Sequence, residues 1–368
     1  MKKPLTSVLD IDEKVWNKLL PDHNPFLKRE FFLALEESGS IGKEAGWIPL
    51  FFLSDDQKSL IYGFIKSHSY GEYIFDWEWA RAYQQNGLQY YPKISSMLPF
   101  TPVNTTPFIM SIFDPEAAKS LLNEFELIYE SNNLSSVHFL FIKPDLKEFF
   151  KEQGYFIRES MQYHFFNQDF MSFDDYLNTL KTKKAKNVRL ERSHSELIIQ
   201  KITGKNLNSI HAKQLYEFYL STIDHKQGID YLKEEFFIKI FETMKDNVLY
   251  VEARKDNRPV AGSLFFYDQI KLYGRYWGSN LMIENLHFEL CYYQGIDFCI
   301  ERGLKVFEAG AQGEHKIARG FRPTRIYSAH KIKNANFSQA IGRYIEEEKT
   351  ILAADIEQLS SQLPFRNI

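Results

Sequence analysis

One short stretch of the sequence gathers most of the residue types that carry out acid–base chemistry. Residues 304–323 read LKVFEAGAQGEHKIARGFRP, with three glycines among acidic, basic and amide side chains. Glycine lets backbone amides approach a ligand closely, and polar clusters that follow a strand often carry function. A solvated surface turn is the alternative interpretation. The mixture of charges favours a site, and its candidate residues are Glu308, Gln312, Gly313, Glu314, His315, Lys316 and Arg319.

A turn earlier in the chain has the features of an anion site. Residues 271–280, KLYGRYWGSN, have the pattern of a strand that ends in a glycine turn, and a helical pattern follows. Free backbone amides and the helix dipole favour anions at such a place. One glycine turn is a weak signal by itself, so phosphate binding here is a hypothesis. Its candidate residues are Arg275, Gly278, Ser279 and Asn280.

The helix expected over residues 283–303 contains a misplaced charge. At about 100° per residue, Glu289 falls in the middle of the apolar side of this helix. A carboxylate that faces a core is costly unless it is paired. Glu289 is therefore a candidate general base, and the alternative is a structural ion pair with Arg275 or Arg319.

The composition limits the classes of protein and partner. A length of 368 residues is typical of two domains, and 44% hydrophobic with 25% charged residues is ordinary for a folded protein. The net charge of −3 argues against DNA as a partner. The sequence shows neither a membrane span nor a signal peptide, which predicts a cytoplasmic protein. Cys291 and Cys299 lack metal-ligand spacing, so we expect reduced core cysteines and no metal site.

An internal repeat indicates how the candidate residues are positioned. FLKREFF, from Phe26, and YLKEEFF, from Tyr231, agree at five of seven positions. Each is followed by the pattern of a strand, a turn and a second strand. The chain therefore contains two copies of one α/β unit. We place the first domain at residues 1–168, the second at 169–337, and an amphipathic helix at 338–368 that packs on the second copy or on a partner chain.

The first copy supplies a second set of polar and aromatic candidates. Residues 67–77 and 90–102 are punctuated by glycine or proline, as is common in loops that present ligand groups. We expect these loops to line the same cleft as residues 310–322. The candidates for this acceptor cleft are His68, Tyr70, Glu72, Asp76, Trp77, Tyr91, Lys93 and Thr101, with Tyr276 and Glu308 from the second copy.

One basic run stands out between the copies. It begins at Lys181, ends at Arg192, and has the pattern of a helix. Such a run is most often a solvated face. The functional alternative is an electrostatic dock for phosphates.

Several motifs together resemble a known family. The RYWGSN turn, the stretch LHFELCYYQGIDFCIERGLKVFEAGAQGEHKIARGF, the SHSYGEY segment from Ser67 and the PFTP segment from Pro99 are similar to motifs of the FemAB-like N-acyltransferases. That group lies within the GNAT superfamily, and the resemblance covers nearly the whole chain. It implies a mixed α/β fold of two tandem GNAT-like domains, each a mixed sheet flanked by helices.

The resemblance also implies a reaction, the transfer of an acyl or aminoacyl group to an amine. The co-substrate would be acyl-CoA or aminoacyl-tRNA, with no tightly bound cofactor. GNAT enzymes grip the CoA pyrophosphate through Arg/Gln-x-x-Gly-x-Gly/Ala; here Arg275 and Gly278 match, whereas Asn280 departs from the last position. Fem enzymes that use aminoacyl-tRNA carry a helical arm, and the run from Lys181 lies near its place but is short. It is nevertheless the candidate contact for tRNA.

The expected chemistry is the same with either donor. The amine loses a proton as it attacks a carbonyl, and the oxyanion needs preorganised donors. Glu289 or Glu314 is the candidate base, directly or through His315, and Lys316 or Arg319 would hold the oxyanion or donor phosphates. The predicted function is N-acyl transfer to an amine of a peptide or cell-wall precursor, or of a small molecule. The alternatives are an aminoacyl-tRNA-dependent Fem-like transferase and a non-catalytic module that recognises peptidoglycan or peptides. The sequence leaves the oligomeric state open.

Overall fold

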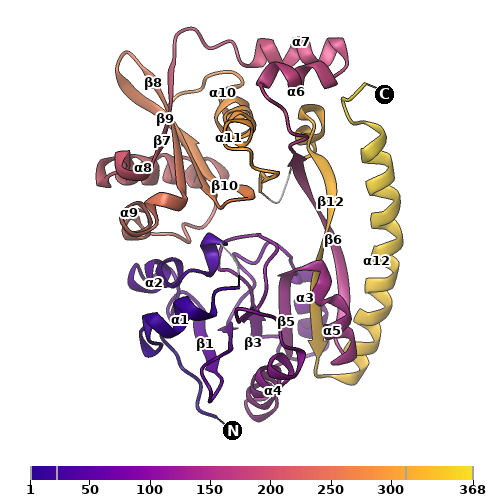
Figure 1. Ribbon diagram of the computed structural model, residues 1–368. Helices are drawn as coiled ribbons and strands as arrows, with labels where there is room; N and C mark the ends of the chain where they lie inside the picture. The colour runs from indigo at the N-terminus through magenta and orange to yellow at the C-terminus, as the bar shows by residue number, and fades with distance from the viewer. Residues whose placement is uncertain (1, 22–23, 311–312, 367–368) are drawn as a thin grey trace. The chain divides into compact units, whose positions relative to one another are not determined.

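The chain forms two compact units that exchange segments. The computed structural model describes residues 2–21, 24–310 and 313–366. The first unit consists of Met1–Met161 with Arg325–Asp355, and the second consists of Gln162–Thr324 with Ile356–Ile368 (Figure 1). The chain therefore crosses between the units at residues 161/162, 324/325 and 355/356, whereas the expected boundaries were near 168 and 337. The first two crossings lie inside strands and the third inside a helix, where the local apolar pattern does not change.

The first unit contains a mixed sheet. Its strands are ordered β1-β2-β3-β5-β12-β6. Strands β3 and β5 run parallel, whereas the pairs β1–β2, β2–β3 and β5–β12 are antiparallel. The bounds are β1 Trp47–Leu53, β2 Leu60–Lys66, β3 Lys93–Ser96, β5 Ser136–Ile142, β6 Phe156–Phe166 and β12 Arg322–Ile332, with the short β4, Phe108–Ile109, beside β2.

The second unit repeats this plan. Its order is β6-β11-β10-β9-β8-β7, and of the neighbouring strands in this order only β10 and β11 run parallel. The bounds are β7 Ile198–Thr203, β8 Val248–Lys255, β9 Arg258–Tyr267, β10 Lys271–Ser279 and β11 Val306–Glu308. The predicted helix–strand–strand repeat is present as α2 (Arg29–Glu37), β1 and β2, and again as α9 (Glu234–Thr243), β8 and β9.

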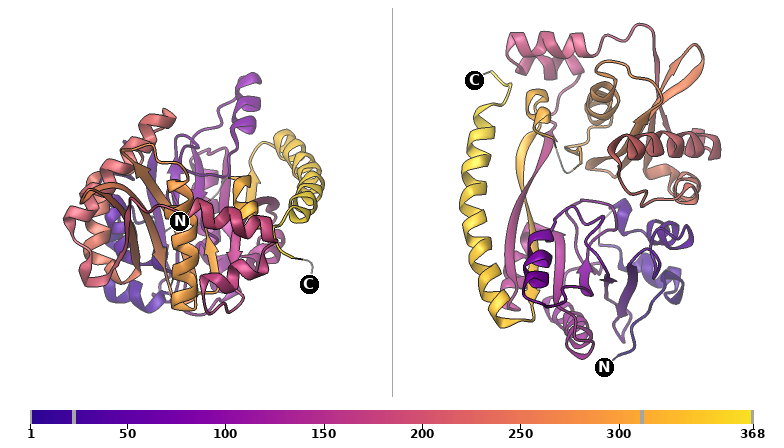
Figure 2. Two further views of the ribbon diagram at one scale, coloured as in Figure 1. Left: turned by 90° about the horizontal axis from the view of Figure 1, so that it is seen from above. Right: turned by 180° about the vertical axis from the view of Figure 1, so that it is seen from behind.

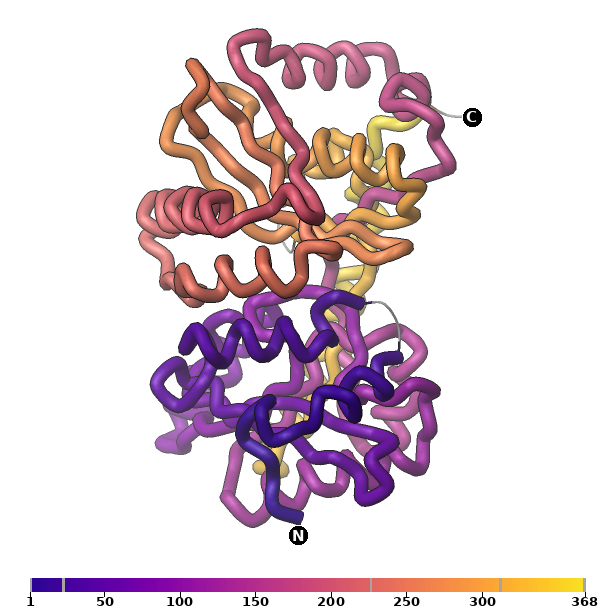
Figure 3. The backbone as a smooth tube through the Cα atoms, turned by 60° about the vertical axis from the view of Figure 1, so that its left-hand side comes forward, coloured from indigo at the N-terminus to yellow at the C-terminus, as the bar shows by residue number. Residues whose placement is uncertain are grey.

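The two units differ from a simple tandem repeat in the strand that completes each sheet. In the first unit β12, from the end of the chain, pairs with β5; in the second unit β6, from the first half of the chain, pairs with β11. Figure 3 traces this path, with the chain leaving the first unit and returning to it near the yellow end. Each sheet thus contains a strand from the other half of the sequence.

Helices flank both sheets. The first unit has α1 (Glu13–Leu19), α2, α3 (Trp77–Gln85), α4 (Pro115–Ser131), α5 (Lys147–Glu152) and most of α12 (Ala335–Ser361), with 3-10 turns at Val8–Asp10, Pro25–Leu27 and Pro144–Leu146. Helix α4 begins at Pro115 because Asp114 caps its first amides and proline is favoured at the first helical position. Its residues Leu122 and Phe125 pack in a core with Phe52 and Phe139.

The second unit has its own set of helices. They are α6 (Phe173–Thr179), α7 (Thr182–Glu191), α8 (Ser209–Lys226), α9, α10 (Leu286–Phe288) and α11 (Gln294–Arg302), with 3-10 turns at Gly204–Asn206, Lys245–Asn247 and Glu314–Arg319. The single helix expected over residues 283–303 is interrupted by a π-helical segment, Glu289–Tyr293. Gly303 ends it in the left-handed conformation, as expected.

The C-terminal helix packs differently from the expectation. Ile341 and Ile345 of α12 lie in a buried cluster with Trp79 and Tyr83 of the first unit. Figure 2 shows α12 as one continuous helix. Docking on the second copy was therefore wrong for these residues, because the apolar face of α12 matches the aromatic face of α3. No helix within the described residues is both long enough and apolar enough to cross a membrane.

Candidate functional site

Two parallel strands part in the second unit, and a pocket lies where they do. Strands β10 and β11 pair over Lys271–Tyr273 and Val306–Glu308, after which β11 ends and β10 continues. Arg275 is the extra residue of a β-bulge, because Gly274 opposes Phe265 and Tyr276 opposes Leu264. Bulges often redirect side chains beside active sites. The resulting strand-end pocket, of about 80 Å³, is lined by Ser263, Leu264, Phe265, Gly274, Arg275, Tyr276, Trp277, His287, Cys291, Tyr292 and Ala309.

Tyr292 lines the strand-end pocket and is hydrogen-bonded to a histidine outside the pocket lining. The hydroxyl of Tyr292 lies 2.8 Å from Nε2 of His315. Burial, followed by the charges of Lys316 and Arg319, lowers the pKa of His315, so its ring is neutral near pH 7. Gly313 is needed here, because it has φ of 115° and a Cβ on it would lie 2.4 Å from the His315 ring. The pair can therefore move a proton at the pocket.

A buried lysine lies beside the same pocket. Lys316 is 2% exposed, and its Nζ donates to the Gly310 carbonyl at 3.0 Å. Burial lowers its pKa to about 7, helped by Arg275 and opposed by Cys291. Arg275 and Cys291 both line the pocket. Lys316 can thus gain or lose its charge near neutral pH.

Glu308, at the end of β11, keeps one carboxylate oxygen open. Its Oε1 accepts a hydrogen bond from Lys271 at 2.9 Å, whereas Oε2 has no partner within the described part of the chain. His164 lies directly opposite on β6. Burial favours a raised pKa, but the charges of His164, Lys271 and Arg275 outweigh it and lower the pKa of Glu308. Glu308 is therefore ionised and able to accept a further hydrogen bond.

Glu289 forms a structural ion pair, which was the alternative to its role as a general base. Both of its oxygens accept hydrogen bonds from Arg192, at 3.1 and 3.2 Å, and Gln294 donates a third at 2.7 Å. Arg192 also reaches Asp297 at 2.6 Å. The partner is thus Arg192, and not Arg275 or Arg319 as expected. These bonds join α7 to the helix that lines the pocket.

The other polar residues of the glycine-rich stretch differ in their contacts and exposure. Arg319 pairs with Glu191 at 2.7 Å and stacks 3.5 Å from the Phe288 ring. Glu314–Arg319 is a 3-10 helix, in which Arg319 Nη1 donates to the His315 carbonyl at 2.8 Å, and the His315 ring also contacts Phe288. Glu314 is exposed, and Gln312 lies outside the described residues.

The turn proposed for phosphates is occupied by packing and internal hydrogen bonds. A Cβ on Gly278 would lie 1.7 Å from the Phe218 carbonyl oxygen, so this glycine lets α8 approach β10. Ser279 Oγ donates to the Leu281 carbonyl at 2.7 Å, and the Asn280 amide donates to Val260 at 2.9 Å. Of this predicted group, only Arg275 lines the strand-end pocket.

The first-unit candidates form a buried network with an aromatic surface. Nζ of Lys93 donates to Glu72 at 2.8 Å, Asp76 at 2.5 Å and Ser69 at 2.8 Å. Tyr91 bonds to the same serine at 2.8 Å. Tyr70 is 44% exposed, and its ring contacts those of His68 and Trp77. Thr101 bonds to the Pro99 carbonyl. Tyr276, in the second unit, contacts Tyr219 and Phe237 and lines the strand-end pocket. The shared cleft with residues 310–322 stays a prediction.

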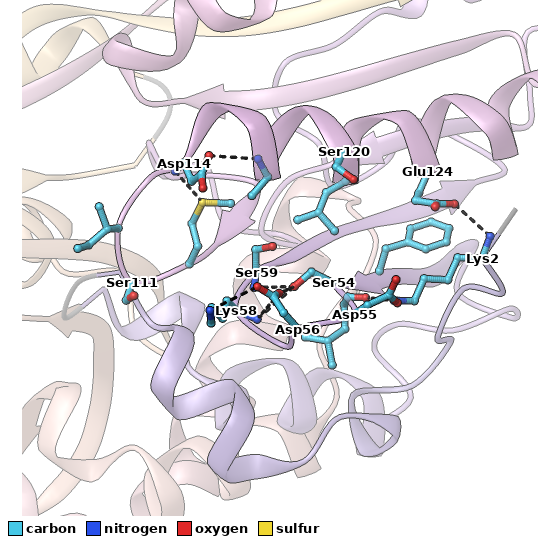
Figure 4. Close-up of a pocket in the computed structure, with 16 residues that line it drawn as sticks. Lys2, Ser54, Asp55, Asp56, Lys58, Ser59, Ser111, Asp114, Ser120 and Glu124 are labelled. Carbon is cyan, nitrogen blue, oxygen red and sulfur yellow. Dashed lines mark hydrogen bonds and ion pairs between the residues drawn. The ribbon is translucent and has the colours of Figure 1, made fainter.

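A separate pocket of about 460 Å³ in the first unit is rich in carboxylates (Figure 4). Asp114 caps α4, and Asp56 accepts hydrogen bonds from Ser54 and Lys58 within its own turn. Asp55 and Glu124 both bind Lys2. Each carboxylate thus has a local structural partner, and the pocket offers less chemistry than the strand-end pocket.

The residues of the basic run differ in their exposure and in their ion pairs. Lys183 and Lys186 of α7 are exposed, whereas Arg192 is turned toward Glu289. Arg189 pairs with Asp174 at 3.0 Å. A contact of α7 with tRNA stays a prediction.

Comparison with known proteins identifies the family of this chain. Residues 7–367 match the FemAB-like family, described as peptidoglycan biosynthesis/recognition. The chain belongs to this family. No curated protein sequence matches the chain.

Solved structures resemble the fold over nearly its whole length. The C-terminal domain of a protein named as a lysylphosphatidylglycerol synthetase from Agrobacterium fabrum has a TM-score of 0.56 at 10% identity, covering 91% of this chain and 96% of that one. FemX has a TM-score of 0.55 at 11% identity, covering 93% and 100%. L-PGS from Bacillus licheniformis has a TM-score of 0.53 at 12% identity, covering 89% and 98%. The predicted fold class, a mixed α/β fold of tandem GNAT-like units, is confirmed.

The sequence interpretation missed several residues of the site. His164 belongs to β6, and its pairing with Glu308 is not visible locally because the two residues are far apart in the chain. Tyr292 and Cys291 were assigned to a regular helix, but they belong to the π-helical segment that lines the pocket. Cys291 is half-buried, which corrects the expectation of a core residue, whereas Cys299 is buried as expected.

Proposed function

We propose that the second unit transfers an acyl or aminoacyl group from an activated donor to an amine of a peptide or cell-wall precursor. The observation that supports this proposal most is that the strand-end pocket lies where β10 and β11 part, with Tyr292 in its wall. The hydroxyl of Tyr292 is in turn hydrogen-bonded to His315. Membership of the FemAB-like family supports the same class of reaction. We place the reaction in the cytoplasm, where both kinds of donor are made.

The residues divide the work as acyl transfer requires. The donor carbonyl enters the pocket, and the cations of Arg275 and Lys316 stabilise the oxyanion. The open oxygen of Glu308 orients the incoming amine. Tyr292 accepts the proton that the amine loses and passes its own to the neutral ring of His315. The tetrahedral intermediate then expels the thiolate or alkoxide of the donor, which takes up a proton.

The two donors draw on different parts of the chain. An aminoacyl-tRNA would use the exposed lysines of α7. An acyl-CoA would need phosphate contacts, and the polar groups of Ser279 and Asn280 that were expected to supply them are bonded within the protein. Assays with both donors and a panel of amine acceptors separate these alternatives.

The deciding test measures transfer and stability together. Tyr292→Phe and His315→Ala should each lower turnover by about 10²- to 10³-fold with little change in the melting temperature. Tyr216→Phe, on α8 and outside the pocket, is the matched control and should behave as wild type. Unchanged specific activity in both pocket variants would remove the proton relay from the mechanism.

Recognition without catalysis is the second candidate function. The exposed ring of Tyr70 and its contacts with His68 and Trp77 favour it, because exposed aromatic side chains commonly bind ligands. Binding of a muropeptide, with no transfer from either donor, would establish recognition and exclude the enzyme.

A further inference from the structure

An apolar groove adjoins the strand-end pocket in the second unit. This groove, of about 660 Å³, lies between α8 and residues 279–288, and we name it the α8 groove. Its apolar lining includes Trp277, Leu281, Met282, Ile283 and Phe288. Leu281 is 44% exposed and Met282 is 102% exposed. Apolar side chains so exposed beside a hollow usually mark a binding surface.

The groove and the strand-end pocket share two walls. Trp277 and His287 line both of them, and their rings lie 4.7 Å apart. The strand-end pocket, at about 80 Å³, has room for only a few atoms around a reacting carbonyl. Any larger transferred group must extend beyond the pocket. The volume of the α8 groove falls in the range of small-molecule sites.

The charges of the groove restrict what enters it. None of its described lining residues is lysine or arginine, and Glu284 adds a negative charge. The other polar lining residues are Ser221, Thr222, His225, Ser279, Asn285 and His287, none of which carries a permanent positive charge. The Glu284 carboxylate repels phosphate groups. The groove is therefore unsuited to the nucleotide part of a donor and suited to an uncharged chain.

We propose that the α8 groove binds the alkyl chain of the acyl group being transferred, so that the preferred donor carries a long-chain acyl group. This inference rests on the proposed function, and it narrows the transferred group from any acyl or aminoacyl group to a fatty acyl group. Trp277 and His287 mark the passage between the reacting carbonyl and its chain.

Binding as a function of chain length tests the proposal without any turnover. We suggest calorimetric titration of the full chain with acyl thioesters of N-acetylcysteamine from two to fourteen carbons, which lack a nucleotide. Each methylene buried in an apolar site strengthens binding about fourfold. We therefore expect Kd to fall about fourfold per methylene until the groove is full. A Kd independent of chain length would overturn the proposal.

Matched variants assign the effect to the groove. Ile283→Glu should remove the gain with chain length and leave the affinity for the acetyl thioester unchanged. Ile270→Glu makes the same substitution at an apolar residue of the same unit that is 58% exposed and outside the groove, and it should match wild type. Leu281→Glu, at a more exposed lining position, repeats the test if Ile283→Glu fails to fold.

Three further outcomes separate this inference from its alternatives. Acetyl or aminoacyl transfer with no dependence on chain length would preserve the proposed function and overturn the fatty acyl assignment. Binding to phosphatidylcholine vesicles that Leu281→Glu abolishes, together with a flat chain-length series, would make the groove a membrane contact and would also overturn it. Loss of all transfer with the chain-length gain in Kd retained would support the groove and contradict the proposed function.

Discussion

The two units place polar residues at matching positions of their sheets but use them differently. In the first unit, Ser95, His138 and His330 face one another across β3, β5 and β12. In the second, Tyr273, Glu308 and His164 occupy the same positions across β10, β11 and β6. His138 and His330 are bonded to each other at 2.7 Å, and each is also bonded to a nearby serine. Glu308 keeps an open oxygen.

The buried lysines of the two clusters show the same contrast. Burial lowers the pKa of Lys93, but Asp76 and Glu72 outweigh it and leave that pKa raised. Lys316 bonds to a carbonyl and lies near Arg275, so burial dominates and its pKa falls to about 7. A lysine that two carboxylates keep charged stabilises the structure, whereas a lysine that titrates near neutral pH is suited to chemistry.

The largest expected effect is on the stability of the first unit. Lys93→Met would leave two carboxylates buried without their cation, which costs about 3–5 kcal/mol in the free energy of unfolding. Lys316→Met removes a lysine whose charge is only partly retained near pH 7 and that bonds to a carbonyl, and it should cost about 1 kcal/mol. Urea unfolding of both variants measures the difference. Equal losses would show that the two lysines have the same role.

The next prediction compares the activity of variants at matching positions of the two sheets. Glu308→Gln keeps the shape of the side chain but removes its charge, and we expect turnover to fall about 10²-fold. His138→Gln, at the corresponding position of the first unit, should lower stability and leave the specific activity of the folded protein unchanged. Initial rates normalised to folded protein measure this. Equal losses of specific activity would contradict the contrast between the units.

The pH dependence of Lys316 gives opposite signs for activity and stability. Its folded pKa, about 7, lies below the ordinary value of 10.5, so the unfolded chain binds more protons between these values. Stability should therefore rise with pH across this window, while transfer falls because the oxyanion loses its cation. Lys316→Arg should flatten the fall in rate, and Lys316→Met should abolish the rise in stability. A wild-type rate that does not change from pH 6 to pH 9 would remove Lys316 from the chemistry.

The smallest effect concerns the two cysteines. Cys291 lines the strand-end pocket, whereas Cys299 is fully buried and burial raises its pKa. Iodoacetamide should modify Cys291 several times faster, as read by peptide mass spectrometry. A bound donor should slow that modification. Equal rates at the two thiols would mean that the pocket is closed to small reagents.

Local patterns in the sequence predicted the elements but not their distant partners. Helix α4 and the repeated helix–strand–strand units follow from capping residues and apolar periodicity, which act within a few residues. The stretch around His315 and Lys316 was found by its polar glycine-rich character. Arg192 was read as part of a basic run because its partner Glu289 is about a hundred residues away. The position of His164 opposite Glu308 also depends on the pairing of strands that are distant in the sequence, which a short sequence pattern does not reveal.

The exchange of β6 and β12 has a consequence for how the chain folds during synthesis. Strand β5 cannot pair with its neighbour β12 until residues 327–332 have left the ribosome, and His330 follows its partner His138 by 192 residues. Until then β5 presents an unpaired edge, which is prone to wrong pairing. Contacts so distant in sequence also slow folding. The first unit, although it begins the chain, therefore completes its sheet last.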